Sequence, residues 1–258
     1  MNERLKYLLR SGSPRFVRDH YGAYTPGELA SYAWHGHRLW YRPGSSDTEL
    51  IYKILLRRGL KGEYALEPKT LAAIGEVRTV LDIGANIGIA ALYLSALFPQ
   101  ARVLAFEPSP DNVPLLKRNA EPVGRIQVVP VALGERDGTL EFFASDGATN
   151  FGGFSRFETG SDSRRKTAVP MREAGRQLAE LGVSGADFIK IDVEGSEWEI
   201  LSALGEAFLA RAKYITGELH GHRDFELLAL LERHFHVAVR KRLQDRVFMF
   251  QAMNRRGT

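Results

Sequence analysis

The stretch Val80–Glu107, VLDIGANIGIAALYLSALFPQARVLAFE, is the part of the sequence that decides the fold. It begins with a short apolar run, turns sharply through Gly84–Gly88, continues as a helical pattern and ends with a second apolar run and an acid. Glycine adopts backbone angles that other residues avoid, and it lets a ligand approach the main chain closely. The helix after the turn directs its free N–H groups at the same point. The pattern predicts one βαβ unit of the nucleotide-binding type.

The glycine spacing and two acids indicate which ligand this unit binds. A dinucleotide-binding turn reads G-x-G-x-x-G, whereas this chain has Gly84 and Gly88 four positions apart, preceded by Asp82. An acid so close to the turn would repel a pyrophosphate. Glu107 follows Gly88 by 19 residues, near the separation of about 20 at which an acid reaches ribose hydroxyls. S-adenosylmethionine (SAM) fits, because it carries a sulfonium, an amino group and a ribose but no phosphate.

The same features predict how the parts of SAM are held. We expect Glu107 to accept hydrogen bonds from the ribose diol, and Asp82 with the backbone of the turn to hold the methionine end. Two small apolar residues after the third predicted strand would lie against the adenine ring. The residues predicted to bind the cofactor are Asp82, Gly84, Ala85, Asn86, Gly88, Glu107, Pro108, Ala132 and Leu133.

The composition is that of a soluble globular protein. Hydrophobic residues make up 44% of the 258 residues and charged residues 26%, which suits one α/β domain with an appendage. The net charge of +4 is spread without a basic stripe, so we do not expect a nucleic-acid partner. The absence of cysteine excludes disulfides, thiolate metal sites and a cysteine nucleophile. We see no secretory signal pattern and no membrane span, and therefore expect a cytoplasmic protein, with which a homo-oligomer is compatible.

Residues 1–75 are predicted to form an N-terminal cap, separate from a main domain at residues 76–258. A short helical pattern opens this cap, and an aromatic-rich segment around His35–His37 suits a small hairpin. A helix is expected over Thr48–Arg57, followed by a loop with Glu63. The cap would either close the substrate pocket or only cover one edge of the sheet, and the sequence pattern is compatible with both.

The main domain alternates strands and helices in the manner of a doubly wound sheet. Its strands are expected at residues 77–82, 102–106, 126–131, 187–192 and 212–218, with a closing antiparallel pair at 236–240 and 246–251. The predicted fold class is α/β: a Rossmann-like class I methyltransferase fold with a mostly parallel seven-stranded sheet and a C-terminal antiparallel hairpin. To this fold we add an N-terminal helical and hairpin cap and a β-hairpin insertion after strand 3.

The insertion, at about residues 138–171, breaks the alternation of strands and helices. Residues 138–143 and 166–171 alternate like half-exposed strands and would pair with each other. The loop between them, residues 145–163, would be either a mobile loop with a substrate-facing part or a surface insertion.

Acids and a histidine collect at the ends of the fourth and fifth predicted strands. Asp192 and Glu194 follow the fourth strand, and Glu218 and His220 follow the fifth. Because ligands of open α/β sheets bind at these strand ends, the four residues are the candidate catalytic set. Methyl transfer from a sulfonium is an in-line displacement, for which the protein chiefly aligns the acceptor. A hydroxyl acceptor also needs a base, and we expect His220 to be that base, with Asp192 and Glu218 as orienting acids.

Several assignments in this region have alternatives. Asp192 and Glu218 could instead hold Mg²⁺ through their carboxylate oxygens, so Mg²⁺ stays an alternative cofactor without a firm metal site. Glu194 is as well placed to cap the following helix as to act in catalysis. His220 could also be a loop histidine without a role. Glu197 and Glu199 are expected at the solvated start of the helix.

Four segments carry a resemblance to a known family: VLDIGANIG at Val80–Gly88, FEPSPDN at Phe106–Asn112, VALGERDG at Val131–Gly138 and FIKIDVEGSEWEIL at Phe188–Leu201. The last segment is the most specific. In these segments the chain resembles the FkbM family of SAM-dependent methyltransferases. The resemblance covers roughly residues 45–250 of this chain, and the region before Arg42 has no counterpart in it. The resemblance implies a Rossmann-like fold, SAM as methyl donor and, usually, O-methylation of sugars, glycans or secondary metabolites. It assigns cofactor binding to Asp82, Gly84, Asn86, Gly88 and Glu107, a site role to Asp192 and Glu194, and, by a weaker pattern, a site role to His220.

The predicted function is therefore SAM-dependent methyl transfer to a hydroxyl of a small molecule, sugar, glycan or secondary metabolite. The alternatives are methylation of a nitrogen or of RNA ribose, and a non-catalytic SAM-binding module. Asp192–Gly195 lacks the Asn/Asp-Pro-Pro-aromatic motif of base amino-methylases, and cytosine C5 enzymes need a cysteine. A nicotinamide-dependent oxidoreductase is disfavoured by the glycine spacing and by Asp82.

Overall fold

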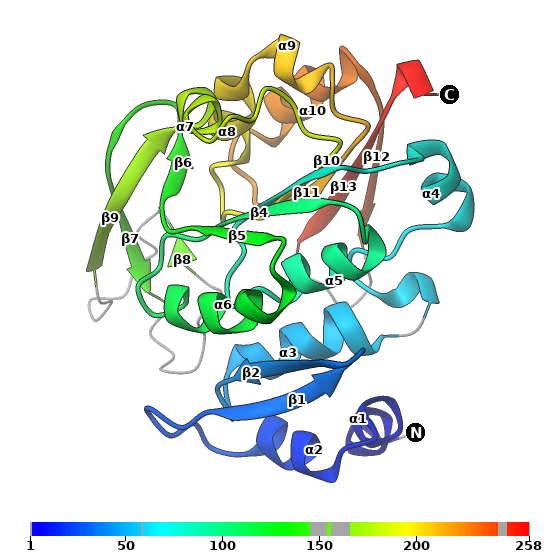
Figure 1. The fold of residues 1–258 in the computed structure, drawn as a ribbon, viewed down its shortest axis with the longest axis vertical. Helices are drawn as coiled ribbons and strands as arrows, with labels where there is room; N and C mark the ends of the chain where they lie inside the picture. The colour runs from blue at the N-terminus through cyan, green and yellow to red at the C-terminus, as the bar shows by residue number, and fades with distance from the viewer. Residues whose placement is uncertain (1, 58, 145–153, 156–165, 242–246, 258) are drawn as a thin grey trace.

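A seven-stranded sheet forms the centre of the computed structural model, which describes residues 2–57, 59–144, 154–155, 166–241 and 247–257 (Figure 1). Its strands are β3 Thr79–Ile83, β4 Arg102–Phe106, β5 Ile126–Val129, β10 Phe188–Ile191, β11 Tyr214–Leu219, β12 Phe235–Lys241 and β13 Phe248–Asn254. They lie in the order β12-β13-β11-β10-β3-β4-β5, and β13 is antiparallel to both of its neighbours while the other pairings are parallel. The predicted fold class, a class I methyltransferase sheet with a C-terminal antiparallel hairpin, is confirmed.

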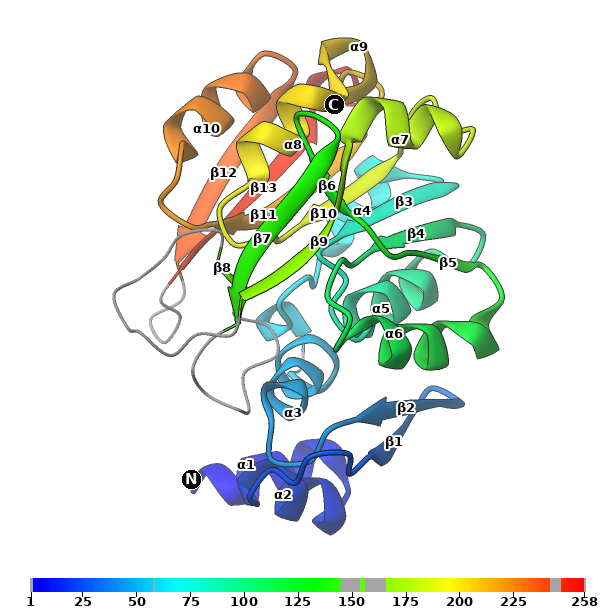
Figure 2. The same cartoon turned by 90° about the vertical axis from the view of Figure 1, so that its left-hand side faces the viewer.

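Helices cover both faces of this sheet (Figure 2). One face carries α4 Pro68–Ile74, α5 Ile89–Leu97 and α6 Val113–Ala120, and the other carries α7 Ala174–Glu180, α8 Glu197–Leu204, α9 Glu206–Leu209 and α10 Asp224–Glu232. Along β3, Val80 packs into the cluster on the α5 side, while Leu81 and Ile83 pack on the α8 side. Both faces of the central strands are buried, which explains the nearly continuous apolar runs that predicted them.

The N-terminal cap packs as an additional layer against α5 and α6, at the bottom of the view in Figure 1. It consists of α1 Glu3–Ser11, α2 Pro14–Tyr21, the strands β1 Ala30–Trp34 and β2 His37–Tyr41, and α3 Ser46–Ile51 continued by a π-helix over Tyr52–Leu56. The hairpin predicted around His35–His37 is confirmed. The helix predicted over Thr48–Arg57 is instead an α-helix whose last turn widens, so that the Arg57 N–H bonds to the Tyr52 carbonyl at 3.0 Å.

Buried polar contacts join the cap to the main domain. Asn119 in α6 bonds both the N–H and the carbonyl of Trp40 in β2, at 2.7 and 3.0 Å. Arg42 pairs with Asp47 at 2.7 Å and also donates to the Asn112 side chain at 2.8 Å. One hydrophobic cluster runs across the predicted boundary after residue 75, because side chains of the cap pack together with those of α5 and α6.

The insertion after strand 3 forms a second, smaller sheet. Its strands are β6 Ala132–Gly134, β7 Gly138–Ala144, β8 Phe154–Ser155 and β9 Lys166–Glu173, in the order β6-β9-β7-β8. The predicted antiparallel pairing of residues 138–143 with 166–171 is confirmed. The loop at residues 145–163 lies outside the described residues apart from β8, so the role predicted for it stays a prediction.

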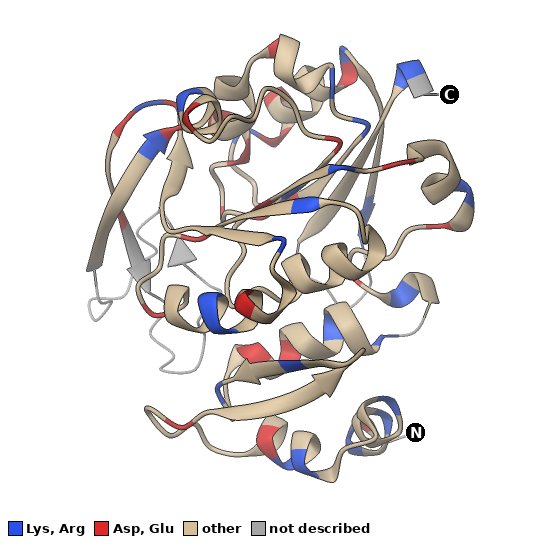
Figure 3. Ribbon diagram, viewed as in Figure 1, with Lys and Arg blue, Asp and Glu red and all other residues tan. Residues whose placement is uncertain are grey.

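The distribution of charged residues along the fold agrees with the mild net charge of the sequence. Lys and Arg are interspersed with Asp and Glu over the described elements in Figure 3 rather than gathered in a stripe. Within the described part of the chain, no helix is long and apolar enough to cross a membrane.

Candidate functional site

A cavity of about 620 Å³ opens at the carboxyl ends of β3, β4, β10 and β11, where the strand order reverses. The sheet side contributes Gly84, Asn86, Glu107, Pro108, Ala132, Leu133, Lys190, Asp192, Glu194 and Glu218 to its wall. The cap contributes His20, Glu49, Lys53, Glu63 and Tyr64, among others. Small-molecule sites typically have volumes of about 300–1,000 Å³, so this cavity is of the expected size.

The glycine turn packs directly against the end of β10. Gly84 has φ +80°, and a Cβ at that position would lie 1.8 Å from the carbonyl oxygen of Asp192. Gly88 has φ +90°, and its Cβ would meet the Leu116 side chain at 2.7 Å. Glycine is therefore required for the close contact between strand ends as well as for the turn itself. This contact brings the predicted cofactor turn and the predicted catalytic Asp192 to the same part of the cavity.

Glu107 lines the cavity and also braces the glycine turn. Its carboxylate accepts hydrogen bonds from the N–H of Asn86 at 2.8 Å and the N–H of Ser109 at 2.9 Å. Burial raises the pKa of Glu107, while these N–H donors act in the opposite direction. Ala132 and Leu133, predicted to contact the adenine, lie on the cavity wall as well.

Asp82 differs from the prediction, because it is buried beneath the turn and does not reach the described cavity wall. Its carboxylate is 0% exposed and forms an ion pair with Lys190 Nζ at 3.1 Å. Lys190 also donates to the Gly84 carbonyl at 2.6 Å, so the pair holds the turn in place. The parallel register sets Lys190 directly beside Asp82, which the local sequence did not reveal. Ala85 and Gly88 are likewise absent from the described wall.

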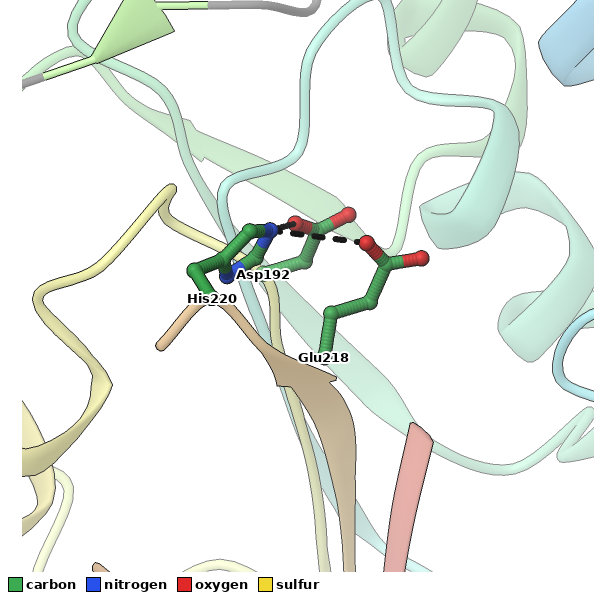
Figure 4. Close-up of side chains that lie close together, drawn as sticks. All are labelled: Asp192, Glu218 and His220. Carbon is green, nitrogen blue, oxygen red and sulfur yellow. Dashed lines mark ion pairs between the residues drawn. The ribbon is translucent and has the colours of Figure 1, made fainter. Parts of the chain in front are cut away.

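The four predicted catalytic residues come together where β10 and β11 end. His220 Nε2 lies 3.5 Å from Glu218, 3.6 Å from Glu194 and 3.7 Å from Asp192. Its Nδ1 bonds to Glu197 at 2.8 Å. Figure 4 shows that His220, Asp192 and Glu218 point toward one another. The three acids of the predicted set line the cavity, whereas His220 is absent from the described wall and its side chain is 9% exposed.

The crowding of acids controls protonation in this cluster. Burial acts to lower the pKa of His220, but Glu197, Glu218 and Asp192 raise it to about 11. Burial and the charge of Glu218 raise the pKa of Asp192 to about 6. Burial and the charge of Asp192 raise the pKa of Glu194 to about 8. At neutral pH the imidazole therefore holds a proton and is not free to accept one, as the predicted base would need to do.

Glu197 and Glu199 are buried, at 1% and 7% exposure, so the prediction of a solvated helix start was wrong. Glu197 accepts a hydrogen bond from the N–H of Val193 at 3.1 Å in addition to its bond with His220. Glu199 contacts Nε2 of His222 at 3.3 Å. The acidic start of α8 faces the segment that follows β11, and the histidines of that segment take the place of solvent.

Glu194 lies in a strained turn between β10 and α8. Its φ is +57°, a conformation that costs a non-glycine residue on the order of 1–3 kcal/mol. Its carboxylate lies on the cavity wall, and the backbone N–H groups at this turn are bonded by Glu197 instead. The geometry therefore favours a site role for Glu194 over the capping alternative.

The cap adds polar residues that the sequence did not place at the site. Burial and the charges of Glu218 and Asp192 raise the pKa of Glu63 to about 7. The N–H of Glu63 bonds to the carbonyl of Lys53, a cavity residue of the π-helix. Single π-helical turns are rare in proteins overall, but those that occur are often found at functional sites. The apolar periodicity of this segment does not distinguish such a turn from a regular helix.

The chain is similar to one domain family and to several curated proteins. The model of the methyltransferase FkbM domain matches residues 82–250. The AMB antimetabolite synthetase AmbE of Pseudomonas aeruginosa is 30% identical over 63% of this chain, and the match spans 10% of AmbE. The hexuronic acid methyltransferase AglP of Haloferax volcanii is 31% identical over 68% of this chain and 69% of AglP. The 2-O-methyltransferase NoeI of Sinorhizobium fredii is 25% identical over 57% of this chain and 65% of NoeI.

Proposed function

The chain belongs to the methyltransferase FkbM domain family, and from this premise we propose that it transfers the methyl group of SAM to a hydroxyl oxygen of a small-molecule or sugar acceptor. The observation that carries the proposal is one shared cavity. Gly84 and Glu107 stand on its wall together with Asp192 and Glu218. A cofactor held at the first pair would therefore face an acceptor held at the second pair.

The residues of the cofactor end bind and orient SAM. Glu107 offers its carboxylate to the ribose, the backbone at Gly84 and Asn86 offers polar groups to the methionine end, and Ala132 and Leu133 offer an apolar surface to the adenine. When bound, SAM supplies an electrophilic methyl group on its sulfonium. Asp82 contributes through Lys190, since their ion pair supports the turn from below.

The residues of the acceptor end align the hydroxyl and take its proton. Asp192, Glu194 and Glu218 are the predicted acids on the cavity wall, so we assign proton acceptance to this group. His220 stands away from the described wall and touches all three, at 3.5–3.7 Å. We therefore propose that His220 positions the acids and that one of them, rather than the imidazole, serves as the base.

The names of the relatives and the polarity of the wall support the proposed acceptor class. NoeI is a 2-O-methyltransferase, which supports an oxygen acceptor, and AglP is a hexuronic acid methyltransferase, which supports a sugar-derived acceptor. Glu49, Lys53 and Glu63 give the cap side of the cavity hydrogen-bonding groups that a polyhydroxylated molecule requires. We propose that residues 1–75 act as a cap over this acceptor.

Calorimetry tests the cofactor half of the proposal. SAM and S-adenosylhomocysteine should each bind with one site per chain, and NAD should not bind. The exposed Glu121→Gln substitution is a suitable control, because Glu121 lies outside the cavity wall. Tight NAD binding without SAM binding would contradict the proposed function.

Mass spectrometry tests the acceptor half. Sugars, uronic acids and hydroxylated secondary metabolites are incubated with SAM and the purified chain, and the product is examined for the gain of one methyl group. Fragmentation should place this group on an oxygen. Transfer to amines alone would overturn the hydroxyl assignment.

A further inference from the structure

The side chains of Asp192, Glu218 and His220 point toward one another (Figure 4), and the two acids also line the cavity. One ligand atom from each residue lies within 4.8 Å of the other two. His220 Nε2 is 3.7 Å from Asp192 Oδ1 and 3.5 Å from Glu218 Oε2, longer than the roughly 2.7–3.2 Å of an N–H···O hydrogen bond. Atoms held at about 2.1–2.2 Å from one cation lie about 3.0–3.6 Å apart at neighbouring positions of a tetrahedral or octahedral shell. The two distances from Nε2 lie near the upper end of this range, so a modest inward shift of the carboxylates would complete such a shell.

The imidazole is aimed into this cluster by its other nitrogen. Nδ1 is held by Glu197 at 2.8 Å, and Glu197 is fixed in turn by the N–H of Val193. The His220 side chain is only 9% exposed, so a direct hydrogen bond from Nε2 to a carboxylate would be expected. The nearest carboxylate oxygen, that of Glu218, nevertheless lies 3.5 Å from Nε2. Histidine ligands of metal ions are commonly oriented in this way, by a carboxylate on the nitrogen that does not bind the metal.

The charge around the imidazole is also unbalanced. Four carboxylates lie within 4 Å of the ring nitrogens, those of Asp192, Glu194, Glu197 and Glu218. The buried ammonium of Lys190 is engaged by Asp82 at 3.1 Å. A bound cation would be the largest local charge and would offset the repulsion among these acids.

We propose that Asp192, Glu218 and His220 bind a divalent cation that accepts both oxygen and nitrogen ligands, with Mn²⁺ as the best match. Binding displaces the proton that Nε2 of His220 holds in the metal-free site and releases it to solvent, while Nδ1–H stays bonded to Glu197. Carboxylates suit Mg²⁺, Ca²⁺ and Mn²⁺, but an imidazole ligand favours a transition metal. Mg²⁺, the alternative cofactor that the sequence indicated, usually binds through one or two carboxylates and retains several waters. The nitrogen of His220 thus changes the expected metal.

The catalytic role of the cation rests on the proposed methylation of a hydroxyl. Asp192 and Glu218 line the cavity, so a cation between them is accessible to the acceptor oxygen. Coordination lowers the pKa of the hydroxyl and orients it. The O–CH₃ bond then forms as the S–CH₃ bond breaks and S-adenosylhomocysteine leaves. The hydroxyl proton passes to Glu194 on the same wall, whose carboxylate the nearby cation would favour in its ionised form.

Titration of Mn²⁺ into the EDTA-stripped full chain, followed by the EPR signal of free Mn²⁺, tests binding without any acceptor. We expect one Mn²⁺ per chain, and at least about tenfold weaker binding for Asp192→Asn and for His220→Gln. The matched control is His222→Gln, which changes the neighbouring histidine paired with Glu199 and should bind as the wild type does. Circular dichroism of each variant checks that it is folded.

Failure of the cation site and failure of the proposed function give different results. Absence of saturable Mn²⁺ binding by the wild-type chain would overturn the cation site. Binding of Mn²⁺ by folded His220→Gln with the same affinity as the wild type would also overturn it. If the wild-type chain binds no Mn²⁺ but still methylates a hydroxyl in the presence of EDTA, the proposed function stands without the cation. Saturable Mn²⁺ binding without transfer to any hydroxyl supports the site and removes the proposed function.

Discussion

The two ends of strand β10 carry aspartates in opposite electrostatic surroundings. Asp187, at the start of the strand, accepts hydrogen bonds from the N–H groups of Arg78 and Thr79 and pairs with Lys213 at 3.1 Å. Burial acts to raise the pKa of Asp187, but these partners outweigh it and lower the pKa. Asp192, at the end of the strand, is crowded by other acids, and its pKa rises to about 6.

The contrast separates an acid whose charge the fold satisfies from the acid to which we assign a role in the site. The carboxylate of Asp187 is paired with backbone N–H donors and with the Lys213 ammonium, so groups of the chain itself compensate its charge. At Asp192 the fold brings acids together, and the positive charges of Lys190 and His220 offset their repulsion only in part, so that the pKa of Asp192 stays raised. Perturbed pKa values of this kind concentrate at functional sites. Between the two, Lys190 and Asp82 form a third arrangement, fully buried and balanced.

The largest effect is expected from unbalancing the buried pair. Lys190→Met leaves Asp82 buried without its cation, and loss of one partner of a buried pair costs about 3–5 kcal/mol of unfolding free energy. Urea denaturation measures this change. The control is Lys213→Met, which breaks the more exposed pair with Asp187 and should cost less than about 1 kcal/mol. Equal losses in both variants would show that burial does not distinguish the two pairs.

A large loss of activity without loss of stability is expected when Asp192, at the carboxyl end of β10, is substituted. Asp192→Asn removes the charge of an acid on the cavity wall to which we assign a role in acceptor alignment, so turnover should fall by on the order of a hundredfold. Its melting temperature should stay equal or rise, because one of several mutually repelling acids is removed. Product formation and thermal unfolding measure the two effects. A destabilised Asp192→Asn variant with full turnover would show that Asp192, like Asp187, contributes to stability and not to catalysis.

A moderate and pH-dependent loss of stability is expected for Asp187→Ala. Two N–H groups lose a charged acceptor, which costs about 1–3 kcal/mol. Because the folded pKa of Asp187 is depressed, its contribution is complete above the unfolded value of about 3.9 and disappears as pH falls through the folded value. Urea denaturation at neutral pH and near pH 3 should therefore show a difference from wild type that narrows in acid. A constant difference would exclude the ionised carboxylate as its source.

The smallest effect is expected at Glu107, a strand-end acid that is both braced and exposed to the cavity. Glu107→Gln keeps one acceptor oxygen for the turn but loses the charge that we propose accepts hydrogen bonds from the ribose. The dissociation constant for SAM should rise about tenfold, which corresponds to about 1.4 kcal/mol. Calorimetry measures it beside Glu121→Gln. Unchanged affinity would leave Glu107 as a brace of the turn only.

Most of the fold was accessible from the sequence because its signals are local. The apolar run and the glycine turn near Gly84, repeated strand and helix periods, and the alternation of Gly138–Phe143 each report the structure of their own segment. The π-helix at Tyr52–Leu56 was not accessible, since a regular helix has the same apolar pattern. The site residues could be predicted from the sequence only because the ends of the strands could be located. That was enough to group Asp192, Glu218 and His220.

What the sequence by itself determined is the class of the fold, the family and the set of strand-end residues. Tertiary structure alone decided which charges meet. Parallel register set Lys190 against Asp82 and withdrew that acid from the cavity, and the start of α8 brought Glu197 to the imidazole of His220. Periodicity records which face of an element is apolar, but the partners of a charge depend on register and on loops far apart in the chain. For that reason the sequence indicated a base, whereas the structure shows an imidazole held among four carboxylates.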